Sequence, residues 1–267
     1  MISRMKADLG TFTLGYGANG AGRPLVLVHG YPHNRSLWDG QLQGLADAAT
    51  VLTVDLRGHG ESDPVAGPYS MDMFADDCAR LLDGLGIRTP VVFGGLSMGG
   101  YVTLAFWRRY PERVAGLILA ATRAGADSAE GRAARDASME TVRREGPGAI
   151  VDAMLRKSLA PDTPDRQPAV LTQARAIMAG ASEAAILGDL AGLRDRPDST
   201  ETLATITVPT LVIHGAQDQL IPPAEAERIA AAIPNAQLAL IAGAGHLPNL
   251  EQPDAFNTIV REFLAGI

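Results

Sequence analysis

The alternation of short, wholly apolar runs with longer helical stretches constrains the fold of this chain more than any other feature. Four such runs lie in the first half, at residues 25–28, 51–54, 91–93 and 114–119. Continuous apolar runs are typical of strands buried on both faces of a sheet. The segments between them, at 36–48, 70–85 and 97–110, have helical patterns. Strands separated by helices predict βαβ units and therefore a mostly parallel sheet of the α/β class.

The alternation stops at residue 123 and resumes only near residue 204. Residues 123–203 contain no convincing strand, but they do contain helical patterns at 147–159, 164–180 and 182–193. Asp127 and Glu130 indicate a variant of the capping box at an earlier helix start. Strands then follow at 210–213 and 237–241, and helices at 223–233 and 254–264. We therefore expect a core of residues 1–122 and 204–267 and a helical segment of residues 123–203. Residues 1–16 are expected to add an antiparallel pair at the sheet edge, which gives eight strands.

The sharpest chemical motif is Gly95-Leu96-Ser97-Met98-Gly99-Gly100, between a predicted strand and a predicted helix. This is the context of a Gly-x-Ser-x-Gly nucleophile elbow, where a tight, strained turn lifts the serine out at a helix N-terminus. The helix dipole and free N–H groups there favour a developing anion. A glycine-rich loop that carries a serine by chance is the alternative. The strand and helix on either side favour Ser97 as a nucleophile.

A serine nucleophile needs a base, and the base needs a carboxylate that orients it. His246 lies in a glycine-containing loop after the last predicted strand, and Asp218 follows the strand before it. With Ser97, these residues all fall at the carboxyl ends of predicted parallel strands, where such sheets bind ligands. The order Ser97, Asp218, His246 is that of a known serine triad. Structural roles are expected for three other histidines, His29, His59 and His214. Three other aspartates compete with Asp218 for the acid role, namely Asp127, Asp195 and Asp198.

An acyl-transfer site also needs N–H donors for the oxyanion. The backbone N–H of Met98, at the predicted helix start, is one candidate. The second should come from the loop His29-Gly30-Tyr31-Pro32 after the first parallel strand. Pro32 has no N–H, so Tyr31 is the candidate donor. A Tyr-Pro turn without a catalytic role is the alternative.

Taken together, these motifs resemble the α/β-hydrolase superfamily over essentially the whole chain. The resemblance rests on five segments: residues 29–32, Asp55-Leu56-Arg57-Gly58-His59-Gly60-Glu61-Ser62, residues 95–100, Gly215 to Asp218, and Gly245-His246. It implies an α/β-hydrolase fold in which residues 123–203 form the helical cap that roofs the pocket. Residues 95–100 with 246–253 look like the branch of 3-oxoadipate enol-lactonases and related carboxylesterases. Epoxide hydrolases and haloalkane dehalogenases of this fold use an aspartate at the elbow, so Ser97 argues against both.

The resemblance and the motifs together predict a serine hydrolase of carboxylic esters or lactones. Two alternatives on the same three residues stay open: a perhydrolase or cofactor-free haloperoxidase, and a carbon–carbon bond hydrolase. A hydrolase-fold protein that only binds a ligand is an alternative of another class. Apolar side chains beside the motifs and in residues 123–203 are expected to line the substrate pocket together with Tyr31: Met98, Met154, Met178, Leu220, Ile221 and Leu247.

Composition argues against several other classes of function. The net charge of −7 and the absence of a basic run disfavour a nucleic acid or an anionic membrane as partner. Cys78 is the only cysteine, so no internal disulfide or cysteine-rich metal site can form. No metal or organic cofactor is implied, because the triad supplies nucleophile, base and anion site. The first ten residues lack the apolar run of a signal peptide, and a cytoplasmic location is expected. Nothing in the sequence indicates the oligomeric state.

Overall fold

One eight-stranded sheet runs through the computed structural model, which describes residues 4–267. The strand order is β1-β2-β4-β3-β5-β6-β7-β8. β2 pairs antiparallel with β1 and β4, and every later pairing is parallel. The strands are β1 (Arg4–Asp8), β2 (Thr13–Asn19), β3 (Pro24–Val28), β4 (Thr50–Val54), β5 (Val91–Leu96), β6 (Val114–Ala120), β7 (Thr210–Gly215) and β8 (Ala236–Ile241). The predicted α/β sheet with an antiparallel edge pair is thus confirmed, although residues 1–3 of the pair lie outside the described residues.

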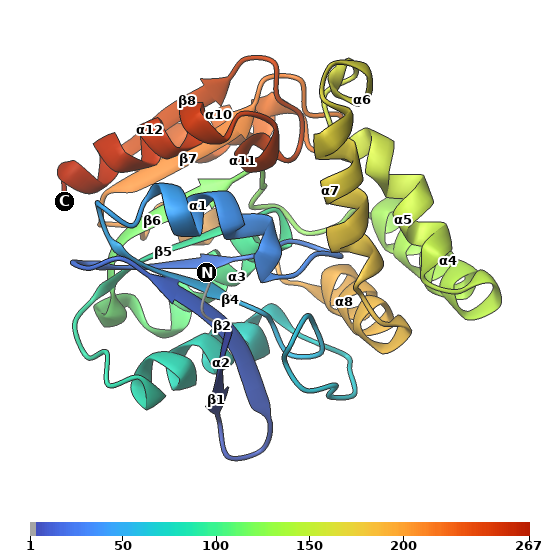
Figure 1. Cartoon of the computed structure of the whole chain (residues 1–267), viewed down its shortest axis with the longest axis horizontal. Helices are drawn as coiled ribbons and strands as arrows, with labels where there is room; N and C mark the ends of the chain where they lie inside the picture. The colour runs from blue at the N-terminus through green and yellow to red at the C-terminus, as the bar shows by residue number, and fades with distance from the viewer. Residues whose placement is uncertain (1–3) are drawn as a thin grey trace.

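Helices cover both faces of this sheet (Figure 1). One face carries α1 (Asp39–Gly44) and α12 (Pro253–Ala265), and the other carries α2 (Met71–Gly84), α3 (Met98–Arg109) and α10 (Pro223–Ala232). Each face has its own apolar cluster, so the central strands are buried on both sides, whereas the edge strand β8 is largely exposed. The helix predicted at 36–48 is shorter than expected, because a 3₁₀ turn (Arg35–Trp38) precedes α1 and the chain leaves the helix at Leu45.

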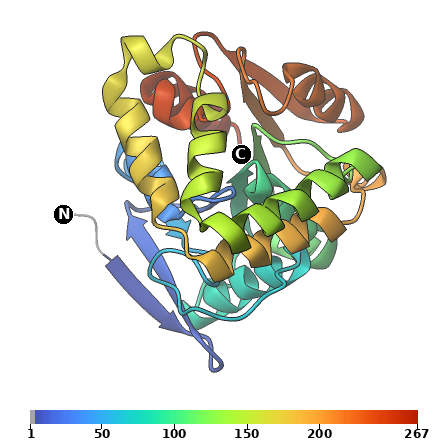
Figure 2. The same ribbon diagram turned by 90° about the vertical axis from the view of Figure 1, so that its right-hand side faces the viewer.

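Residues 123–203 form a group of helices beyond the carboxyl ends of the strands (Figures 1 and 2). The helices are α4 (Ala129–Glu145), α5 (Gly148–Leu155), α6 (Thr163–Arg166), α7 (Pro168–Ala179), α8 (Glu183–Asp195) and α9 (Thr200–Leu203), with a 3₁₀ turn at Arg156–Ser158. In this group α4 packs along α8 and against α5, and α5 packs against α7. We call residues 123–203 the insertion.

Two local predictions in the insertion were wrong. The helix predicted at 164–180 is divided into α6 and α7, because Pro168 lacks the N–H that would continue the first helix. The helix α4 is capped by Ser128 rather than Asp127, since the Ser128 side chain accepts a hydrogen bond from the Gly131 N–H. Asp127 has a different role, described below.

No single helix within residues 4–267 is long and apolar enough to cross a membrane. Two consecutive helices have the required length and composition only when taken together, Pro168–Ala179 and Glu183–Asp195, and the chain bends by 92° between them.

Candidate active site

Ser97 occupies a strained turn between β5 and α3. Its φ of 56° and ψ of −112° lie in a region that side chains other than glycine rarely adopt. The surrounding backbone holds it there, because the Ser97 N–H donates to the Ala120 carbonyl at 2.9 Å and the Thr122 hydroxyl donates to the Ser97 carbonyl at 2.8 Å. The serine therefore stands at the N-terminus of α3, as the motif predicted.

The flanking glycines are required by close backbone contacts. A Cβ on Gly95 would lie 2.2 Å from the Gly99 carbonyl oxygen, and a Cβ on Gly99 would lie 2.2 Å from the Val28 carbonyl oxygen. No larger residue fits at either position without moving the main chain. The two glycines thus allow α3 to begin directly against β3 and β5, which fixes the position of Ser97.

His246 and Asp218 form a buried pair. The His246 Nδ1 lies 2.7 Å from Asp218 Oδ2, and both side chains are nearly inaccessible to solvent. Asp218 Oδ1 accepts hydrogen bonds from the backbone N–H groups of Leu220 and Ile221 at 2.8 and 3.0 Å. These contacts fix the carboxylate, which in turn fixes the orientation of the imidazole ring.

The surroundings of Asp218 favour its charged form. Burial on its own raises the pKa of this carboxyl, but His246, His214 and the Ile221 N–H together hold the pKa well below its usual value. Asp218 is therefore a carboxylate at any pH near neutral. A lasting negative charge at this place would stabilise an imidazolium at His246.

His214 also lies beside the His246–Asp218 pair, which the sequence did not indicate. Its Nε2 lies 3.0 Å from Asp218 Oδ2 and 2.9 Å from the Ile221 carbonyl oxygen.

His29 and His59 have structural contacts, as expected. His29 Nε2 accepts from the Leu56 N–H at 3.1 Å, and His59 Nε2 lies 2.9 Å from Asp189 Oδ2. Of the histidines, only His246 borders the cavity at Ser97.

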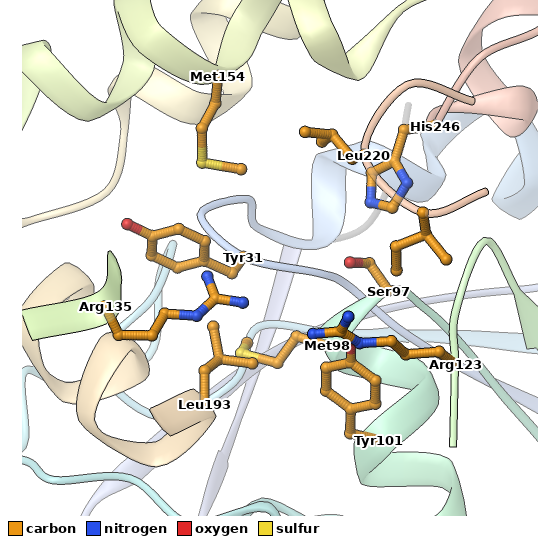
Figure 3. A pocket seen from close by; sticks show the side chains of 11 residues that line it. Tyr31, Ser97, Met98, Tyr101, Arg123, Arg135, Met154, Leu193, Leu220 and His246 are labelled. Carbon is orange, nitrogen blue, oxygen red and sulfur yellow. The ribbon is translucent and has the colours of Figure 1, made fainter. Parts of the chain in front are cut away.

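A cavity of about 130 Å³ joins Ser97 to His246 (Figure 3). In Figure 3 the His246 ring lies above Ser97, and Met154 reaches in from the insertion. The lining residues come from the core and from the insertion: Tyr31, Ser97, Met98, Tyr101, Arg123, Arg135, Met154, Leu193, Leu220, Ile221 and His246.

The structure places five of the seven predicted pocket residues on this cavity, and two elsewhere. Met178 and Leu247 are fully buried in the apolar cluster beneath α1 and α12 and do not line it. Both were chosen for their position next to a motif or helix, which does not say which way a side chain points. Tyr101, Arg123, Arg135 and Leu193 line the cavity but were missed. No sequence signal distinguishes these two arginines from the chain's many others.

The loop after β3 approaches the elbow closely. A Cβ on Gly30 would lie 2.8 Å from the Leu96 carbonyl oxygen and 3.2 Å from Ser97 Cβ. Tyr31, the next residue, and Met98 both border the cavity beside Ser97. This placement is compatible with their predicted roles as backbone donors to an oxyanion.

The competing acids lie elsewhere. Asp127 forms ion pairs with Arg123, Arg135 and Arg196. Asp195 pairs with Arg194, and Asp198 accepts from the backbone of Ala126 and Thr200. None of these carboxylates has a recorded contact with His246. Within residues 4–267, no group of three or more histidine, cysteine or acidic side chains could hold a metal ion.

Comparisons with known proteins identify the family and the fold of this chain. A family model described as "alpha/beta hydrolase fold" matches residues 23–253. The 3-oxoadipate enol-lactonase 2 of Acinetobacter baylyi is 31% identical over 241 residues, which cover 90% of this chain and 88% of that protein. A malate-bound thermophilic esterase from Thermogutta terrifontis has a TM-score of 0.95 at 40% identity, covering 99% and 98% of the two chains. A bromoperoxidase from Bacillus anthracis has a TM-score of 0.87 at 27% identity, covering 98% and 100%.

Proposed function

The chain belongs to the α/β-hydrolase family, and we propose that it cleaves small carboxylic esters or lactones with Ser97, His246 and Asp218. One observation carries this proposal. A serine on a strained elbow and a histidine paired with a buried carboxylate border the same cavity. Relatives named as an esterase and an enol-lactonase support the substrate class. The small cavity volume favours short substrates over long acyl chains.

The proposed mechanism follows from the roles of the three side chains. Ser97 Oγ attacks the acyl carbon while His246 removes its proton, and Asp218 stabilises the resulting imidazolium. The N–H groups of Tyr31 and Met98 stabilise the tetrahedral oxyanion, and loss of one such donor costs about 3 kcal/mol in other enzymes. His246 then protonates the leaving alcohol. Water, activated by the same histidine, hydrolyses the acyl-enzyme.

The insertion is proposed to act as a cap over this chemistry. Met154 from α5, Arg135 from α4 and Leu193 from α8 border the cavity opposite the core residues. A lid of this kind excludes bulk water from the acyl-enzyme and shapes the substrate site. On this proposal the insertion selects the substrate, and the core performs the reaction.

The test is turnover of p-nitrophenyl acetate together with labelling by a fluorophosphonate. The expected result is steady hydrolysis and one covalent adduct, which peptide mass spectrometry assigns to Ser97. Labelling at another residue, or neither turnover nor labelling, would contradict the proposal. Binding of a small ester without turnover would instead favour a hydrolase-fold binding protein.

A second candidate is peracid formation from a carboxylic acid and hydrogen peroxide on the same three residues. The similarity to a bromoperoxidase favours considering it. Product analysis of acetate incubations with and without peroxide distinguishes peracid formation from ester hydrolysis. Accumulation of peracetic acid at a rate above that of ester hydrolysis would favour the perhydrolase. The same analysis with a β-diketone substrate would detect a carbon–carbon bond hydrolase.

A further inference from the structure

The cavity is bordered by an unbalanced group of charges centred on Asp127. This buried carboxylate is paired with the guanidinium groups of Arg123, Arg135 and Arg196. Arg135 Nε lies 3.1 Å and Arg196 Nη1 2.8 Å from its oxygens. One negative charge therefore faces three positive charges. Although burial opposes it, Arg135 and Arg196 hold the pKa of Asp127 below its usual value, so the carboxylate is charged.

The three arginines are used differently. Arg196 is buried, donates to the carbonyls of Leu193 and Gly125 at 2.8 and 2.9 Å, and stacks over the Tyr101 ring at 4.3 Å. Its contacts are structural. Arg123 and Arg135 both line the cavity, and their side chains are 34% and 26% exposed. Among residues 4–267, the recorded contact of Arg135 with an acceptor is through Nε alone.

Other charged groups near these arginines are engaged elsewhere. Asp198 acts on Arg196, whose contacts are structural, and it accepts hydrogen bonds from the Ala126 and Thr200 N–H groups. Glu225 acts on Arg123, but it also forms its own ion pair with Arg228. Asp189 lies near Tyr31, but it is fully buried against His59. The cavity therefore keeps a positive wall formed by Arg123 and Arg135.

Two buried donors beside this wall have no partner within the described part of the chain. They are the Tyr31 hydroxyl and Arg123 Nε, and both residues line the cavity. Burial raises the pKa of Tyr31, so its hydroxyl keeps the proton and can donate. A ligand in the cavity that carries acceptor oxygens would satisfy both donors, which are costly when buried without an acceptor.

On the basis of the proposed hydrolase activity, we infer that the preferred substrates carry a carboxylate at the far end of their acyl part, held by Arg135 and Arg123. A carboxylate supplies the negative charge and the acceptor oxygens that this wall lacks. The acyl side is assigned because His246 must face the leaving alcohol. In Figure 3 the two guanidinium groups and the His246 ring lie on opposite sides of Ser97.

The decisive comparison uses two methyl esters of nearly equal shape. One is monomethyl glutarate, and the other is the same ester with its free carboxylate replaced by a carboxamide. The carboxylate ester is expected to have the higher kcat/KM by about tenfold or more, the size expected for one charge-assisted hydrogen bond. Arg135→Gln should remove most of this preference while leaving Asp127 paired with Arg123 and Arg196. High salt should weaken the preference in the wild type, since both arginines are partly exposed.

Arg132→Gln is the matched control, because Arg132 lies on the same helix but is exposed and away from the cavity. This variant removes the same charge and should keep the wild-type preference. Equal kcat/KM values for the two esters in the wild type, or an unchanged preference in Arg135→Gln, would overturn the inference. Turnover of p-nitrophenyl acetate in the same preparations shows separately whether the proposed function holds.

A binding measurement keeps the inference testable without turnover. Calorimetry should detect monomethyl glutarate binding to Ser97→Ala and much weaker binding to Ser97→Ala combined with Arg135→Gln. Equal affinities in the two variants would overturn the carboxylate site even in an active esterase. Loss of binding on Arg135→Gln would support the site even if no ester were hydrolysed.

Discussion

Ser97 shows how a single residue can be held in an unfavourable backbone conformation by its neighbours. The contacts of Gly95 and Gly99 leave no room for another path between β5 and α3. A conformation of this kind costs on the order of 1–3 kcal/mol and persists only where the surrounding structure enforces it. The strain places the hydroxyl at the mouth of the cavity instead of along the helix.

Ser97→Ala is expected to abolish ester hydrolysis without unfolding the protein. Alanine keeps the same Cβ, so it adds no strain at the elbow. Loss of the nucleophile in a well-studied serine protease lowers kcat by about 10⁶-fold. The measurements are steady-state hydrolysis of p-nitrophenyl acetate and a thermal unfolding curve. Retention of more than a few per cent of the activity would show that another group is the nucleophile.

Asp218→Asn is expected to lower kcat by about 10⁴-fold, because an amide favours the wrong imidazole tautomer. The pKa of Asp218 is lowered by its partners, so the carboxylate is charged throughout the neutral range. Asparagine cannot ionise, so changing the pH within that range should not restore the variant. The stability that Asp218 contributes is present above about pH 4 and is lost as the pH falls through the lowered pKa.

The control for this prediction is Asp127→Asn, which alters the arginine cluster but not the His246 pair. It should retain turnover of a neutral ester far better than Asp218→Asn. The reverse order of activities would transfer the acid role to Asp127. Urea unfolding of both variants at neutral and acidic pH checks the stability part of the prediction.

At the scale of elements, the sheet was predictable and the contacts of the insertion were not. Strands buried on both faces must be apolar throughout, so β3, β5, β6 and β7 are visible in the sequence. The edge strand β8 is largely exposed, but its apolar-rich run is also visible. Ser97, Asp218 and His246 could be placed because each follows such a strand. The pairing of Asp127 with Arg123, Arg135 and Arg196 depends on how α4 and α8 meet, which periodicity does not reveal. The direction of Met178 depends on how α7 packs against α5 and α11, which periodicity does not reveal either.

Glu251 connects the insertion to the loop that carries His246. Its two carboxylate oxygens accept from the Gly245 N–H at 2.7 Å, the Ala160 N–H at 2.7 Å and the Thr163 hydroxyl at 2.6 Å. Gly245 directly precedes the proposed base His246, and Ala160 and Thr163 lie in the chain between α5 and α7. Glu251 therefore joins these insertion helices to the loop of His246 through hydrogen bonds.

Met154 is expected to set the preferred acyl length, because it borders the cavity from α5. Met154→Ala should shift the ratio of kcat/KM values toward longer p-nitrophenyl esters, and Met154→Trp toward shorter ones. Each accommodated methylene contributes about 1 kcal/mol or less. Met178→Ala is the matched control, since that methionine is buried away from the cavity. It should lower stability and leave the chain-length profile unchanged, whereas an equal shift in both variants would refute the assignment.

The whole molecule is joined across its two parts by a buried ion pair. His59 follows β4 in the core and Asp189 lies on α8, and neither side chain is exposed. The two ring nitrogens of His59 lie 3.0 Å from the Arg57 carbonyl oxygen and 2.9 Å from Asp189 Oδ2. Both partners are acceptors, which favours a doubly protonated ring. Burial alone would lower the pKa of His59, but Asp189 raises it above its usual value.

Asp189→Ala is expected to destabilise the protein by about 3–5 kcal/mol, because it leaves the buried His59 without its counter-charge. Asp195→Ala on the same helix removes an exposed pair with Arg194 and should cost no more than about 1 kcal/mol. Urea unfolding measures both. The contribution of His59 should be full below about pH 6.5 and should decline as the pH rises through its raised pKa. Equal stabilities of the two variants at pH 6 would argue against the buried pair.

The contacts of Glu251 and of the His59–Asp189 pair also limit how this molecule can change by recombination. Replacing residues 123–203 with a segment that lacks an acid at position 189 and a hydroxyl at position 163 would remove both contacts together. The recipient core would then keep a buried histidine without its counter-charge and a buried carboxylate that has lost one of its hydrogen-bond donors. A viable chimera must therefore carry positions 59 and 251 with the transplanted segment, although more than 40 residues separate each of them from it. Point substitutions on the cavity wall leave both of these buried contacts in place.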